Sequence, residues 1–132
     1  MKDKCFTFDA GKAKDYFLKE ISFKTSPNEL NQHIKERIEE LNIIDVRQYD
    51  DYIDGHIPFA IHVPFDSFEE HLVMFDKDKL NIIYGYCPYC KMPYKAAYIL
   101  AEKGYPVMVL SGGYKIWVKK GFETIKTSDN QI

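Results

Sequence analysis

Short continuous runs of apolar residues are separated along this chain by stretches in which apolar residues recur every three or four positions. The continuous runs at residues 41–46, 81–86 and 106–110 predict strands buried on both faces of a parallel sheet. A short apolar piece at residues 60–63, between two prolines, predicts another strand, and residues 22–25 are expected to be extended and to join the sheet or run along it. The pattern indicates an α/β protein.

The stretches with helical spacing predict the helices. Ser26-Pro27-Asn28-Glu29 is a helix start, with Ser26 as the N-cap, Pro27 at the first helical position and Glu29 completing a capping box. Further helices are expected after an Asp9 cap, as one turn from Asp50 that a left-handed Gly55 ends, and over residues 67–75, 93–103 and 114–119. We expect residues 1–25 to form a helical extension packed on the domain, residues 26–124 the domain itself, and residues 125–132 a polar, frayed tail.

Length, net charge and cysteine content limit the classes of protein to which this chain can belong. The chain has 132 residues, which suits one domain, and its net charge of −2 provides no general attraction to nucleic acid or to a membrane. No signal peptide or membrane span is recognised, so we expect a cytoplasmic protein. Its three cysteines are too few for a disulfide framework, and we interpret Cys5 as a bystander. No cofactor is expected, and the sequence does not indicate the oligomeric state.

Cys87 lies where a predicted strand stops and a loop begins, with the helix over residues 93–103 following. α/β proteins place their chemistry at such strand ends. Free backbone N–H groups of the loop and the positive end of the helix would favour a thiolate there. From the residues alone we interpret Cys87 as a nucleophile in an anion-binding cradle.

Three polar residues elsewhere invite other assignments. Asp45, at the end of a buried strand, needs a partner, and Arg47 or a neighbouring loop backbone could supply it. A structural role for this pair is favoured over a catalytic one. His56 and His62 are six residues apart with no Cys or carboxylate at ligand spacing, so no metal site is expected. We interpret His56 as a residue that ties a loop to the backbone.

Several pieces of the sequence together resemble the rhodanese family of sulfurtransferases. These are Ile44-Asp45-Val46-Arg47 followed by Tyr52, then Gly55-His56-Ile57-Pro58, Tyr86-Cys87, Ala96-Ala97, and Gly112-Gly113 with Trp117. They occur in family order over about residues 26 to 122. The resemblance implies a five-stranded parallel sheet flanked by helices on both faces, with a transferable sulfur on Cys87 as a persulfide. It also implies structural roles for Asp45 and Arg47, and a six-residue loop whose amides wrap the sulfur.

The loop departs from the family pattern. Its members after Cys87 are Pro88, Tyr89, Cys90, Lys91 and Met92. The usual arginine and the serine or threonine after it would fall at Met92 and Pro93, so the fork that grips thiosulfate is missing. Lys91 or Lys95 could supply charge, but only as a point charge. Phe59 also stands where the family usually has glycine.

The alignment of the loop has two versions. We prefer the one that places Cys87 at the nucleophile, because its spacing to Ala96-Ala97 then needs no gap. A shifted version places Gly85 there and leaves Cys90 as the second thiol.

Three functions remain open. The first is a sulfurtransferase or persulfide carrier, with a small sulfur donor (a persulfide or thiosulfate) and a thiol or protein acceptor. The second is a thiol-disulfide redox protein, because Cys87-Pro88-Tyr89-Cys90 is also the active-site motif of glutaredoxins. In an amide cradle, however, we expect Cys90 to face away from Cys87, so a disulfide would need the loop to unwind before Cys90 could act as a resolving residue. The third is a rhodanese-like binding module without catalysis.

Overall fold

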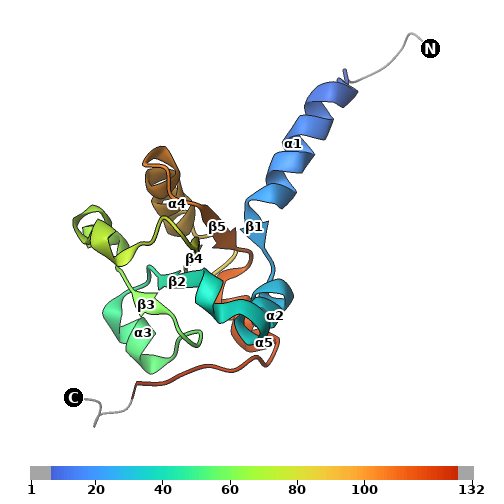
Figure 1. The fold of residues 1–132 in the computed structure, drawn as a ribbon. Helices are drawn as coiled ribbons and strands as arrows, with labels where there is room; N and C mark the ends of the chain where they lie inside the picture. The colour runs from blue at the N-terminus through green and yellow to red at the C-terminus, as the bar shows by residue number, and fades with distance from the viewer. Residues whose placement is uncertain (1–6, 128–132) are drawn as a thin grey trace.

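The computed structural model describes residues 7–127 (Figure 1). The elements, in chain order, are α1 (Ala10–Ser22), β1 (Lys24–Thr25), α2 (Pro27–Arg37), the 3-10 helix η1 (Ile38–Glu40), β2 (Leu41–Asp45), α3 (Tyr49–Asp54), β3 (Ile61–His62), the 3-10 segment η2 (Phe65–Met74), β4 (Leu80–Tyr84), α4 (Met92–Glu102), β5 (Val107–Leu110) and α5 (Gly113–Lys119).

The five strands form one parallel sheet in the order β1-β5-β4-β2-β3. This confirms the α/β class and the five-stranded parallel sheet that the resemblance implied. The central strands β2 and β4 pair in register from Leu41 with Leu80 to Asp45 with Tyr84. Their carboxyl ends therefore lie side by side at the carboxyl edge of the sheet, which is the border where the parallel strands end. The residues that follow the two strands are brought together there.

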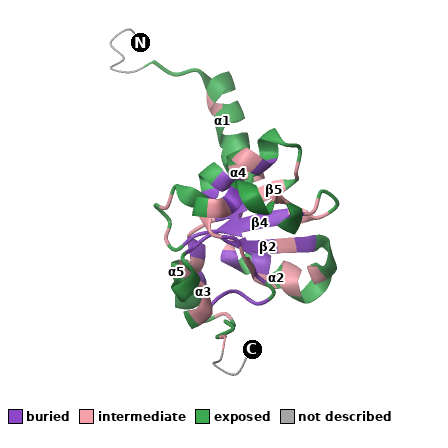
Figure 2. Ribbon diagram, turned by 90° about the vertical axis from the view of Figure 1, so that its left-hand side faces the viewer, coloured by how far each residue is buried: buried purple, intermediate pink, exposed green. Residues whose placement is uncertain are grey.

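Each face of the sheet has its own apolar core. One face buries Ile43 and Ile82 with Leu30 of α2 and Trp117 of α5. The other buries Ile44 and Ile83 together with side chains of η2 and α4. Neighbouring residues of a strand point to opposite faces, which explains why the strands read as continuous apolar runs. Figure 2 shows the buried sheet enclosed by more exposed helices.

The helix starts are well predicted and some other details are not. Ser26 and Glu29 form the expected capping box at α2. The segment expected to be a helix over residues 67–75 is instead the 3-10 segment η2, with non-helical angles at Ser67 and His71. Gly55 is extended, with φ 171°, and not left-handed. A Cβ at this position would overlap the hydroxyl of Tyr114, so a larger residue would require that side chain to move.

The two ends of the chain also differ from expectation. Asp9 caps α1 as predicted, through a 3.0 Å hydrogen bond from the Lys12 N–H. Yet α1 is not packed along the domain: no residue of it is buried, and the helix projects away from the sheet (Figure 1). At the other end, the start of the expected frayed tail is held by Ile125, which exchanges backbone hydrogen bonds with His56. Cys5 and residues 128–132 lie outside the described residues.

Within residues 7–127, no helix is long and apolar enough to cross a membrane.

Candidate active site

A buried ion pair occupies the carboxyl end of β2. Asp45 is completely buried, and its carboxylate accepts hydrogen bonds from the Arg47 backbone N–H at 2.9 Å and from Arg47 Nη2 at 2.8 Å. Arg47 Nη2 also donates to the carbonyl of Gly55 at 2.6 Å. With its neighbours satisfied in this way, the pair can be buried without a large net cost.

Two tyrosines contact this ion pair. The hydroxyl of Tyr84 donates to Asp45 Oδ2 at 2.6 Å and accepts from the Ile57 N–H at 3.1 Å. Burial, together with the Asp45 charge, raises the pKa of Tyr84 well above its ordinary value. The guanidinium of Arg47 lies 4.0 Å from the centre of the Tyr114 ring. We call Asp45, Arg47 and Tyr84 the edge network; its geometry suits a structural role, since the arginine charge is already paired.

The residues between β4 and α4, 85–91, form what we call the dithiol loop. Its first two residues are fastened to the start of α5: the Tyr114 N–H donates to the Gly85 carbonyl at 2.9 Å and the Lys115 N–H to the Tyr86 carbonyl at 2.7 Å. Gly113 makes this approach possible, because a Cβ there would lie 2.8 Å from the Gly85 oxygen. The start of the loop is therefore held rigidly at the sheet edge.

The two thiols of the loop are in contact, and the expectation that Cys90 faces away from Cys87 is wrong. Their sulfur atoms are 3.2 Å apart, and the Cys90 N–H donates to the Cys87 carbonyl at 3.2 Å. This turn closes the loop on itself and turns the second side chain back toward the first. The Cys90 N–H is therefore bonded within the turn and does not point into a cradle around Cys87.

A cavity of about 180 Å³ opens beside the thiols. It is lined by Val46, Arg47, Gln48, Asp51, Gly85, Tyr86, Cys90 and Met92. Cys90 therefore faces this cavity, whereas Cys87 is absent from its lining. Gly85 forms part of the wall, and a Cβ on it would lie 3.1 Å from Pro93 Cδ and 3.5 Å from Cys90 Cβ.

The environment of Cys90 favours its thiolate. Burial by itself raises the pKa of the Cys90 thiol, but the hydrogen bond with the Cys87 side chain and the backbone groups of Cys87 and Tyr86 outweigh burial and lower that pKa below its ordinary value. A thiolate is the reactive form of cysteine in substitution and in exchange with disulfides.

Of the remaining residues that the sequence singled out near Cys87, only Met92 lines this cavity. Pro88 and Tyr89 are exposed, Tyr89 to 89%. Met92 lines the cavity but offers no hydrogen-bond donor. Lys91 and Lys95, proposed from the sequence as sources of charge, line a separate hollow beside α4 with Phe65, Tyr94, Tyr98 and Ile99.

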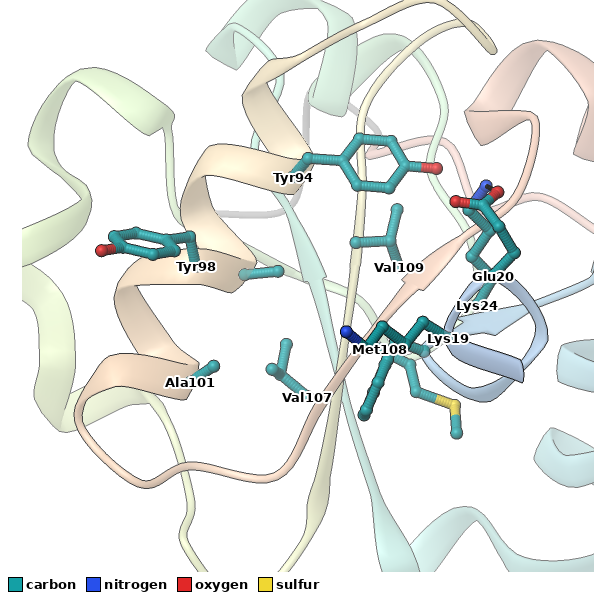
Figure 3. Close-up of a pocket in the computed structure, with 11 residues that line it drawn as sticks. Lys19, Glu20, Lys24, Tyr94, Tyr98, Ala101, Val107, Met108 and Val109 are labelled. Atoms are coloured by element: carbon teal, nitrogen blue, oxygen red, sulfur yellow. Dashed lines mark hydrogen bonds and ion pairs between the residues drawn. The ribbon is translucent and has the colours of Figure 1, made fainter. Parts of the chain in front are cut away.

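A further, mostly apolar cavity of about 370 Å³ lies between α4, β5 and the base of α1. Figure 3 shows Tyr94 and Tyr98 of α4 on one side of it and Val107 of β5 on another, with Lys24 near its rim. None of the dithiol-loop residues lines it, so it is separate from the thiols.

His56 lies away from the thiols in a structural setting. It is buried, its ring stacks on Tyr52 with centres 4.0 Å apart, and its Nδ1 is 2.9 Å from the Tyr52 carbonyl. Two contributors to the site were missed from the sequence. Tyr114 was expected only as part of a helix, and Gln48 carried no signal at all.

Comparisons with known proteins agree with this fold. A family model for the rhodanese-like domain matches residues 26–120. The crystal structure of BH2092 protein from Bacillus halodurans is 32% identical, covers 90% of this chain and 88% of that chain, and superposes with a TM-score of 0.82. The "Putative sulfurtransferase YtwF" of Bacillus subtilis is 31% identical over 90 residues, which are 64% of this chain and 82% of that protein.

A third relative is much longer. The HTH-type transcriptional regulator Rv0324 of Mycobacterium tuberculosis is 32% identical over 78 residues, 59% of this chain. The match spans only 34% of that protein's length.

Proposed function

Because the chain belongs to the rhodanese-like domain family, we propose that it is a sulfurtransferase or persulfide carrier that holds a sulfane sulfur on a thiol of the dithiol loop. The observation that carries this proposal is the position of the thiols. They follow β4 at the carboxyl edge of the sheet, beside a cavity and at the start of α4. Parallel α/β sheets bind their substrates at this edge.

The cavity supports a persulfide donor over thiosulfate. Met92 lines it where a guanidinium would be needed to grip a sulfonate. The charge of Arg47 is engaged by Asp45, and Lys91 and Lys95 line another hollow. A donor with little charge does not need the missing clamp, and the acceptor would be a thiol on a small molecule or a protein. A reducing cytoplasm would keep both thiols ready to accept sulfur.

Mass measurement on the intact chain tests the proposal. After incubation with a small-molecule persulfide and removal of excess reagent, at least one of the two single-thiol variants, Cys87→Ser or Cys90→Ser in a Cys5→Ser background, should gain one sulfur atom, which cyanide removes as thiocyanate. A variant with both Cys87→Ser and Cys90→Ser is the matched control and should gain none. If no single-thiol variant gains sulfur, the sulfur-transfer proposal fails and a rhodanese-like binding module without catalysis becomes the better account.

A second function, thiol-disulfide exchange, is favoured by the 3.2 Å contact between the two sulfurs. A protein disulfide needs the sulfurs at about 2.0 Å, so only a small movement would close one. Exposure to a small disulfide, without any sulfur donor, should then yield a chain that has lost two hydrogens. A chain that remains a dithiol under those conditions would exclude this function.

A further inference from the structure

The surroundings of the two loop thiols are unequal, and the inequality assigns them different roles. We propose that Cys90 accepts the sulfane sulfur and that Cys87 then displaces it as sulfide, closing a Cys87–Cys90 disulfide. The proposal rests on the sulfur-transfer function above and reverses the sequence-based expectation, in which Cys87 was the nucleophile and Cys90 the resolving residue.

Access is the first difference. Cys90 lines the cavity of about 180 Å³ together with Gln48 and Asp51 from the segment after β2, whereas Cys87 does not line it. A donor that enters this cavity therefore meets Cys90 and not Cys87. Gly85 contributes to the same opening, because a side chain at this position would extend toward Cys90 and Pro93.

Position relative to α4 is the second difference. Cys90 directly precedes Lys91, which is the N-cap of an 11-residue helix and makes no side-chain capping bond. The free N–H groups and the dipole at such a helix start favour an anion close by. Cys87 lies three residues further from the helix. Its thiol contacts the Cys90 sulfur and can donate to it, which stabilises the thiolate on Cys90.

The proposed chemistry balances without an external oxidant. In the first step the Cys90 thiolate attacks the outer sulfur of a small persulfide, forming a Cys90 persulfide and releasing the donor's thiol. In the second step the Cys87 thiolate attacks Cys90 Sγ, 3.2 Å away. The bond between Cys90 Sγ and the sulfane sulfur breaks, and hydrosulfide leaves with the electron pair. The two thiols are oxidised, the sulfane sulfur is reduced, and a dithiol reductant restores the protein.

The test compares four full-length chains, all in a Cys5→Ser background: the intact loop, Cys87→Ser, Cys90→Ser and the double variant. Each receives cysteine persulfide, followed by measurement of intact mass and released sulfide. We expect the intact loop to release one sulfide per chain and lose two hydrogens. Cys87→Ser should keep one extra sulfur that cyanide removes and release no sulfide, and Cys90→Ser should gain none. Thermal unfolding of each chain verifies that all four are folded.

The outcomes separate this inference from the function on which it rests. If Cys90→Ser gains sulfur and Cys87→Ser does not, sulfur transfer stands and the roles of the thiols are the reverse. If the intact loop holds a stable extra sulfur and releases no sulfide, Cys87 is not a resolving residue and the inference is overturned. If no chain gains sulfur and the intact loop releases no sulfide, both proposals fall.

Discussion

Two groups of side chains lie at the same edge of the sheet, and they are held in opposite ways. In the edge network, Asp45 is completely buried and Arg47 is 8% exposed, and every charged group has a partner. In the dithiol loop, both cysteines are only partly buried and their main contact is with each other. The edge network contains the last residues of β2 and β4, which pair in register, and the dithiol loop follows β4 directly.

This difference indicates where stability and reactivity reside. A buried, fully bonded network costs a great deal to disrupt and offers little to a substrate. A partly exposed thiol pair contributes little to the free energy of unfolding but can meet a reagent. Substitutions in the first group should therefore be seen in unfolding experiments, and substitutions in the second in chemical ones.

The largest expected effect on stability comes from Asp45→Ala. It leaves the Arg47 charge buried without its partner and removes the acceptor of the Tyr84 hydroxyl. The free energy of unfolding should fall by about 3–5 kcal/mol in denaturant titrations. Asp54→Ala is the control, because its pair with Lys126 spans 3.9 Å between exposed side chains and should be worth less than about 1 kcal/mol. Equal losses in the two variants would contradict the structural role of the edge network.

Next comes Gly113→Ala, which tests the fastening of the dithiol loop. The new Cβ would clash with the Gly85 oxygen and would sit on a backbone with φ 67°. Overpacking and the left-handed conformation together should cost about 3 kcal/mol.

Its matched control is Gly104→Ala, which has φ 86° but no atom within 4 Å of the new Cβ. There only the backbone term remains, about 1 kcal/mol. If the two alanine variants lose the same free energy of unfolding, the close approach of α5 to the loop is unimportant to stability.

A smaller change, in the opposite direction, is expected from Phe59→Gly. Phe59 has φ 71° and its side chain is 66% exposed, so glycine relieves backbone strain with little loss of burial. The gain in the free energy of unfolding should be about 0.5–1 kcal/mol after the entropy of the added glycine is counted. Phe59→Ala removes the same ring without relieving the strain and should show no gain; a gain of the same size there would assign the effect to the ring.

The smallest effect on stability, but a clear chemical one, is expected in the dithiol loop. Since the Cys90 pKa is lowered, a larger fraction of its thiol is ionised at a pH below the ordinary cysteine value, and alkylation should stay fast there. In Cys87→Ser, loss of the Cys87 thiol should shift the pH profile of Cys90 alkylation upward, toward that of a free thiol. Alkylation rates are measured by mass in a Cys5→Ser background. The pH range is 5–9, which extends from well below to just above the free-thiol pKa of about 8.5. Identical profiles with and without Cys87 would show that the neighbouring thiol does not activate Cys90.

Much of the fold follows from local patterns. The capping box at Ser26 and the apolar runs of β2, β4 and β5 each specify their element through neighbouring residues. The pairing of Asp45 with Arg47 could also be predicted from the sequence, because both residues lie at the end of one buried strand. The exposure of α1 was not: its apolar residues have helical spacing, but spacing does not say whether another surface covers them.

The class of fold and the stretch that holds the thiols could be predicted from the order of the residues, because periodicity, caps and strand ends are properties of neighbouring residues. Which thiol lines the cavity, and that the two touch, is seen only in the folded chain. Those facts depend on the turn from Cys87 to Cys90, on the contact of the loop with α5, and on the chain after β2 that lines the same cavity. Residues distant in sequence create that environment, so no pattern within the loop could specify it.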